Sequence, residues 1–342
     1  MSYKRYVQQF NIIPGTLPTG PQNALTDVPG VLVGHTTRVE GDNIRTGVTA
    51  IKPHAGNIFE QPVTAAVHTI NGFGKATAFE QIREQGVVET PIILTNTLSV
   101  WRAADALVSY MLQQTPSIRS VCPVVGECND AYVNDIRLRS ITEADVFAAL
   151  ESAHDGPVEQ GSVGGGTGTT CYGFKGGIGT SSRVVNGYTF AILLQTNFGD
   201  RTELRMGGAD VGWQLRDKYL PAKAPSGGSI MIILATDAPM SSRQLGRLAR
   251  RVQFGLGRTG STCTNGSGEF VIAFTTDQSR TFVRDDDTMN AYFGAVVDCA
   301  EESIYNALLS ATTVTGLDGH TLYALPHDEL RRILGVQDQL SG

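Results

Sequence analysis

A serine stands at the first position of a strongly apolar segment, directly after two glycines. Ser229 follows Gly227 and Gly228 and precedes Ile-Met-Ile-Ile-Leu-Ala. Glycine tolerates strained backbone angles, and a sheet holds the first residue of a buried strand rigidly. If the Gly228–Ser229 bond were cut, Ser229 would carry an α-amine of pKa about 7.7–8.0 beside its hydroxyl, and that amine is a built-in general base. The same residues also occur at ordinary loop-to-strand junctions, so alone they leave both interpretations open.

Two further segments place polar groups at the ends of expected strands. Asn265-Gly266-Ser267-Gly268-Glu269 puts a hydroxyl and a carboxylate on a turn just before an expected strand, where they can relay a proton. Asn197 ends another expected strand, and its amide can donate to an oxyanion. Asn-Gly and Ser-Gly are also common turn dipeptides, and a lone asparagine at a strand end is usually a cap. The first pair can help catalysis only if Glu269 reaches Ser229 directly or through Ser267.

The glycine run Gly164–Gly168 does not match a phosphate-binding loop. It lacks the Gly-Lys-Ser/Thr of a P-loop and does not fit the strand-GxGxxG-helix order of a dinucleotide site. Residues 176–183 can line a cleft with small side chains or turn between strands. The six histidines are scattered, and neither HxxxH nor CxxC occurs. We therefore expect neither a metal nor a cofactor.

The elements that must position these residues follow from the hydrophobic pattern. Short β-branched runs bounded by Gly, Pro, Asn and Asp predict strands, and apolar residues at helical spacing predict helices. The expected strands cover residues 31–35, 48–52, 63–70, 92–95, 188–196, 229–236 and 270–276, and the expected helices cover 99–114, 142–153, 241–256, 289–310 and 328–334. These elements predict helices covering a layered sheet.

Composition excludes several classes of protein. Of the 342 residues 41% are hydrophobic, which is enough for a large core and rules out disorder. A net charge of −6 without a basic block argues against nucleic-acid binding. No segment approaches 18 uninterrupted apolar residues and no signal peptide is evident, so we expect neither membrane insertion nor secretion. Five cysteines, an odd number, favour reduced thiols and a cytoplasmic location.

Taken together, the segments resemble the L-aminopeptidase/D-esterase and β-aminopeptidase family, which comprises self-processing relatives of the N-terminal-nucleophile hydrolases. Motifs that carry the resemblance occur in the same order over nearly the whole chain: 23–28 (NALTDV), 33–37 (VGHTT), 45–51 (RTGVTAI), 96–97 (NT), 163–168 (VGGGTG), 175–183 (KGGIGTSSR), 235–239 (ATDAP) and 265–268 (NGSG). The resemblance implies an α+β fold, a four-layer αββα sandwich. It also implies one domain, 1–342, that cuts itself into an α chain 1–228 and a β chain 229–342.

The resemblance also assigns residues to roles. Ser229 matches the nucleophile behind the cut, Ser267 and Glu269 match a pair credited with proton transfer, and Asn197 matches the oxyanion-stabilising asparagine. For substrate binding, Tyr132 resembles the family's pocket tyrosine, and Glu127 or Asp130 stands where an acid can meet the substrate ammonium. The stretch 126–129 lacks the aromatic residue expected there, which leaves the pocket size and the substrate choice open.

The expected function is an aminopeptidase or amidase that releases N-terminal residues from short peptides, amides or esters through an acyl-enzyme on Ser229. The family's homo-oligomers of αβ units are expected here as well. One alternative is acyl transfer of the ornithine acetyltransferase kind, which normally presents threonine at the cut. Another is a non-catalytic nucleotide- or metabolite-binding protein using the glycines 164–168. The preference between α- and β-amino or L- and D-residues is not set by the sequence.

Overall fold

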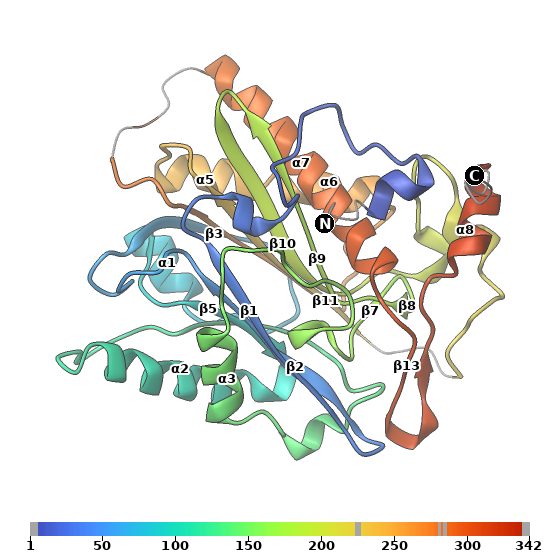
Figure 1. Cartoon of the computed structure of the whole chain (residues 1–342), viewed down its shortest axis with the longest axis horizontal. Coiled ribbons are helices and arrows are strands. Elements are labelled where there is room, and N and C mark those ends of the chain that lie inside the picture. Colours follow the sequence, from blue (N-terminus) through green and yellow to red (C-terminus); the bar gives the residue numbers. More distant parts are fainter. Residues whose placement is uncertain (1–5, 223–226, 280–281, 283–285, 337–342) are drawn as a thin grey trace.

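Two sheets lie face to face, and helices cover both outer faces (Figure 1). The structure, a computed structural model, describes residues 6–222, 227–279, 282 and 286–336. The first sheet has four strands in the order β1-β2-β5-β6, and the second has six in the order β4-β3-β12-β11-β10-β9. In Figure 1 α2 and α3 lie below the first sheet, and α5 and α7 lie above the second.

The four-stranded sheet is antiparallel except for the pair β5–β6. Its strands are β1 (Leu32–Glu40), β2 (Ile44–Lys52), β5 (Ile92–Asn96) and β6 (Val124–Cys128). Helices α2 (Val100–Gln114) and α3 (Glu143–Glu151) pack against its outer face. A capping box closes the first turn of α3: Thr142 Oγ1 accepts from the Asp145 N–H, and the Asp145 carboxylate accepts from the Thr142 N–H.

The six-stranded sheet has one parallel pair, β11–β12, at its centre. Its strands are β3 (Val63–Gly72), β4 (Val87–Val88), β9 (Ile178–Val185), β10 (Tyr188–Asn197), β11 (Gly228–Thr236) and β12 (Ser267–Thr275). Helices α5 (Ser242–Ala249) and α7 (Asp286–Leu309) contact its outer face, and α6 (Val252–Arg258) packs against α7. Strand β11 is flanked by β10 and β12, and its two faces are covered by the other sheet and by the outer helices. A strand buried in this way needs apolar residues at every position.

Alternate residues of β11 belong to different cores. Met231 and Ile233 pack toward the four-stranded sheet, and Ile230 and Ile232 pack toward the helices over the outer face. Strand β6 crosses the inner face of β10 and β11. The expected αββα layering is thereby confirmed, with one core between the sheets and another under α5–α7.

The smaller elements connect these layers. Among them, the hairpin β7–β8 matters most for the site because it lies beside the end of β10. Their bounds are α1 (Phe79–Gln85), β7 (Thr170–Cys171), β8 (Phe174–Lys175), α4 (Val211–Gln214), β13 (Val314–Thr315), β14 (Thr321–Leu322) and α8 (His327–Leu334). None of the helices in the described ranges is long and apolar enough to cross a bilayer.

Two expectations about elements are corrected. The helix expected over 241–256 is broken into α5 and α6, because the Arg251 and Phe254 N–H groups bond to carbonyls three residues back instead of four. Strand β12 starts at Ser267 and not at 270, so Ser267 and Glu269 lie within the strand and not on a turn. The strands β6 and β9 were not expected. In β9 the buried Ser181 hydroxyl donates a hydrogen bond to the Cys299 carbonyl oxygen, so a polar residue occupies a buried position and the sequence shows no apolar run there.

Candidate active site

Ser229 lies at the start of β11, in the middle of the six-stranded sheet. Its neighbours across the sheet are Asn197 on β10 and Gly268 on β12. Only 3% of the Ser229 surface is exposed, and its hydroxyl lies beside the Cys128 thiol without a well-formed hydrogen bond. Gly227, two residues earlier, has a φ of +77°, a backbone region that favours glycine. A buried hydroxyl without a well-formed hydrogen bond is unusual in a stable core and is a feature of reactive positions.

Asn197 presents its amide on the same face of the sheet as Ser229. The two residues form a directly opposed antiparallel pair, so their side chains are neighbours. Asn197 Oδ1 accepts from the Thr170 backbone N–H at 3.2 Å and from the Thr170 hydroxyl at 3.1 Å. A backbone N–H can only donate, which identifies the bonded atom as the oxygen. The amide NH₂ therefore remains available to donate beside Ser229.

Ser267 and Glu269 lie on the opposite face of the sheet from the Ser229 side chain. Gly228 pairs with Ser267 and Ile230 pairs with Glu269, and paired residues of parallel strands point to the same side. A Cβ built on Gly228 would lie 3.1 Å from the Ser267 hydroxyl. The fold thus brings Ser267 to the backbone just before Ser229, and not to the Ser229 hydroxyl itself.

The Glu269 carboxyl is almost fully buried. Only 1% of the residue is exposed, and its polar neighbours are the Cys263 thiol and the Ser267 hydroxyl. Burial raises its pKa above the ordinary value, and the Cys263 thiol and the Ser267 hydroxyl lower it only in part. A carboxyl in such a place takes up a proton more readily than an exposed one.

A cavity of about 240 Å³ adjoins the Gly228–Ser229 junction. Thr170 and Asn197 line one part of it, and Gly227 and Gly228 line another. Sequence reasoning missed Arg201, which also lines it. The Arg201 guanidinium lies 3.4 Å from the centre of the Phe174 ring. It donates to backbone carbonyl oxygens of two separate segments, those of Tyr172 and Gly173 and those of Lys218 and Tyr219. A single arginine in a polar stretch of sequence does not indicate that its side chain will join separate backbone segments beside a cavity.

Glu127 lies on β6, next to a turn that contacts the strand bearing Glu269. A Cβ built on Gly74 would lie 3.4 Å from Glu127 Oε1 and 3.2 Å from the Gly268 Cα. Gly74 therefore lies between the Glu127 carboxylate and β12, the strand that pairs with β11 at Ser229. The Thr97 hydroxyl and the Lys75 N–H donate to Glu127, and the Lys75 ammonium lies 4.0 Å away. Burial raises its pKa, and these donors oppose the rise.

Asp130 follows β6 and is 1% exposed. Its Oδ1 accepts from the Asn134 amide at 2.9 Å, whereas its Oδ2 has no partner. Burial raises the pKa of Asp130 to about 7, against opposing hydrogen bonds from Thr46 and Asn134. Neither Glu127 nor Asp130 lines the cavity at Gly228, so the structure does not bring them directly to the cut.

Tyr132 packs against a histidine near the chain's end. Its ring stacks on that of His320 with centroids 4.5 Å apart and planes inclined by 9°, and its carbonyl oxygen lies 2.9 Å from His320 Nδ1. The residue is half-buried and does not line the cavity at Gly228.

Other segments of the chain pack directly against the glycines of the run 164–168. A Cβ on Gly165 would lie 2.2 Å from Gln195 Oε1, and one on Gly166 would lie 2.5 Å from the Ile178 backbone nitrogen. Glycine is required here by close packing of chain segments. The loop therefore has no room for a phosphate, which removes the basis of the nucleotide-binding alternative.

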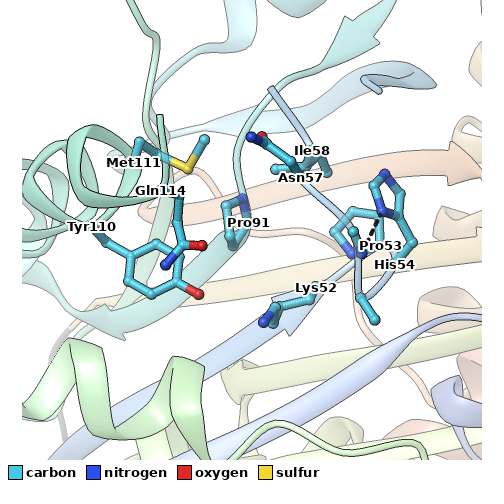
Figure 2. A pocket seen from close by; sticks show the side chains of 11 residues that line it. Lys52, Pro53, His54, Asn57, Ile58, Pro91, Tyr110, Met111 and Gln114 are labelled. Atoms are coloured by element: carbon cyan, nitrogen blue, oxygen red, sulfur yellow. Dashed lines mark hydrogen bonds between the residues drawn. The ribbon is translucent and has the colours of Figure 1, made fainter. Parts of the chain in front are cut away.

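A second cavity lies apart from all these residues (Figure 2). One wall consists of three residues of α2, Tyr110, Met111 and Gln114. The other includes Lys52, the last residue of β2, and His54, which lies just after that strand. Its volume is about 80 Å³, less than that of the cavity at Gly228, and none of the residues expected to do chemistry lines it. It is not the candidate active site.

Comparison with known proteins identifies relatives over nearly the full length. The model of peptidase family S58 matches residues 23–322. A β-peptidyl aminopeptidase, BapA of Sphingosinicella microcystinivorans, is 39% identical over 94% of this chain and 90% of its own. Among solved structures, a β-aminopeptidase from Burkholderia sp. superposes with a TM-score of 0.88 at 39% identity, covering 96% of this chain and 98% of its own. An L-aminopeptidase/D-Ala-esterase/amidase from Ochrobactrum anthropi, described as a variant of the N-terminal-nucleophile hydrolase fold, gives 0.87 at 37% identity, covering 99% and 100%.

Proposed function

The chain belongs to peptidase family S58 and is a hydrolase of the aminopeptidase and amidase type, and on that premise we propose that Ser229 is its nucleophile after self-cleavage of the Gly228–Ser229 bond. The observation that carries the proposal is the pairing of Ser229 with Asn197 beside the cavity at Gly228. A nucleophile and an oxyanion donor then face the same reacting carbonyl.

The cut is an attack of the Ser229 hydroxyl on the carbonyl of Gly228. The C–N bond breaks, the hydroxyl proton passes to the departing Ser229 nitrogen, and Gly228 becomes an ester on Ser229 Oγ. Water then hydrolyses that ester, which leaves a carboxylate on Gly228 and a free α-amine on Ser229. Because Ser229 is 3% exposed in the uncut chain, substrate access also requires Gly227 and Gly228 to move away after the cut.

In turnover the new α-amine serves as the general base for the Ser229 hydroxyl. The Asn197 NH₂ donates to the oxyanion, and the amine passes its proton to the leaving nitrogen. Ser267 and Glu269 are proposed to act on the amine: Ser267 lies beside the backbone at Gly228, and both residues lie on the sheet face away from the Ser229 hydroxyl. The acyl-enzyme is then hydrolysed by water in the same site.

Purified protein is expected to consist of two chains of 228 and 114 residues that stay together under native conditions. The smaller chain retains its place because β11 is buried on both faces, and its release would expose that apolar surface to water. Denaturing mass spectrometry combined with native mass spectrometry measures both properties. A single full-length mass that persists on incubation would contradict the proposed cut.

Substrates are expected to need a free amino group next to the scissile carbonyl. One of the buried carboxylates, Glu127 or Asp130, is proposed to bind that ammonium, which places the amino end of the substrate beyond the cavity at Gly228. Loss of a charged hydrogen bond typically costs 2–5 kcal/mol, or about 30- to 4,000-fold in rate. One peptide amide, free and N-acetylated, should be compared by kcat/KM, with Glu127→Gln and Asp130→Asn as the matched variants. Equal rates for the two substrates would leave an amidase without aminopeptidase character, and an unchanged preference in both variants would place the anchor elsewhere.

Two further properties belong to the proposal. A homo-oligomer of αβ units is supported by the family resemblance and by large apolar side chains on the surface, among them Trp101 and Trp213. A cytoplasmic location is supported by the five cysteines, all of which are unpaired.

A further inference from the structure

We propose that Thr170 is a positioning residue for the oxyanion site, because it fixes which end of the Asn197 amide faces Ser229; this inference rests on the function proposed above. Two donors of one residue, the backbone N–H and the hydroxyl of Thr170, bind Asn197 Oδ1 at 3.2 and 3.1 Å. Rotation of the amide by half a turn would place the NH₂ against these donors and present an oxygen, which cannot donate, to the oxyanion. Thr170 therefore selects the productive orientation.

Hydrogen bonds hold the hairpin that carries Thr170 on both sides. Thr170 pairs with Lys175 across β7–β8, and Lys175 is fully buried with its ammonium bound to the carbonyls of Gly166 at 2.9 Å and Gly176 at 2.7 Å. The Tyr172 N–H donates to the Phe198 carbonyl at 2.7 Å, which ties β7 to the residue after Asn197. The donors of Thr170 are thus held on both sides, and their direction does not depend on side-chain packing alone.

The hydroxyl of Thr170 can be removed without changing the shape of the side chain. Thr170→Val keeps the backbone N–H and loses one of the two donors, so the amide orientation is weakened but not lost. Because a neutral hydrogen bond contributes about 1 kcal/mol, kcat should fall about 5- to 10-fold. KM should change less than about twofold, because the oxyanion forms only in the transition state. Thr170→Ser keeps the hydroxyl and should return kcat to within about twofold of wild type.

A double-mutant cycle separates positioning from a general structural effect. The variants are Thr170→Val, Thr170→Ser, Asn197→Ala and Asn197→Ala/Thr170→Val, each assayed on one peptide amide, with rates normalised to the cut fraction measured by mass spectrometry. Adding Thr170→Val to Asn197→Ala should change kcat less than about twofold, because there is no amide left to orient. The same loss in both backgrounds, or a Thr170→Val enzyme as fast as wild type beside a slow Asn197→Ala, would overturn this inference alone. Wild-type protein without turnover, or Asn197→Ala as fast as wild type, would overturn the proposed function and this inference with it.

Discussion

Ser229→Ala is expected to leave the chain uncut and to abolish turnover. Alanine has no hydroxyl to attack the Gly228 carbonyl, so neither the new amine nor an acyl-enzyme can form. Loss of a catalytic serine costs on the order of 10⁶-fold in kcat. Denaturing mass spectrometry should show one full-length chain, and kcat on a peptide amide should fall to the background.

The fold should tolerate this substitution. The Ser229 hydroxyl is buried and makes no well-formed hydrogen bond, so its removal costs little stability, and the melting temperature of the uncut alanine variant should equal or exceed that of the cut wild type. Ser229→Thr, which keeps a hydroxyl at the same place, is the matched control and should still be cut, though more slowly because the extra methyl group must fit a buried site. An alanine variant that is cut at Gly228 or turns over substrate would refute the assignment of the nucleophile.

Glu269→Gln is expected to slow both self-cleavage and turnover by about 10²- to 10⁴-fold, the range typical of a general acid–base group. Glutamine keeps the shape of the side chain and loses only the ability to take up a proton. The rate of self-cleavage should be followed by mass spectrometry, and kcat/KM should be measured on the cut fraction alone. Full activity of the glutamine variant would show that Glu269 does not transfer protons.

The pH dependence gives an independent test of Glu269. Burial raises its pKa above 4.5, so on acidification it becomes protonated earlier than an exposed glutamate and can no longer act as a base. Protonation of the Ser229 α-amine gives kcat/KM an acid limb in both proteins. Wild type should lose further activity above pH 4.5 as Glu269 becomes protonated, and this additional loss should be absent in Glu269→Gln.

Stability should move in the opposite direction to activity. A carboxyl whose pKa is raised by folding destabilises the native state as pH rises from the unfolded pKa to the folded one, and this loss persists above both. Thermal melts at neutral pH should therefore place Glu269→Gln at or above wild type. A large drop in its melting temperature would mean that the lost activity reflects unfolding.

The strand content of the site could be predicted because burial leaves a local pattern. The apolar run after Ser229 and the one before Asn197 each match a strand that is covered on both faces, and such runs need no knowledge of the rest of the chain. The layer architecture and the residues of the nucleophile motif followed from the ordered motifs that carry the family resemblance. The break between α5 and α6 left no such pattern, since its apolar stripe continues through the break.

The amino-acid sequence by itself therefore determined the αββα layering, the family and the residue types available for catalysis. Only the tertiary structure decided which of them meet. The Asn197–Ser229 pairing is a matter of strand register between segments some 30 residues apart, and the placement of Ser267 and Glu269 on the face away from the Ser229 hydroxyl depends on β12 beginning at Ser267 in parallel with β11. Thr170 and Arg201 gain their roles through hydrogen bonds to atoms of other segments. Side-chain type is local information, whereas register, facing and the partner of each donor are set by the packing of the whole chain.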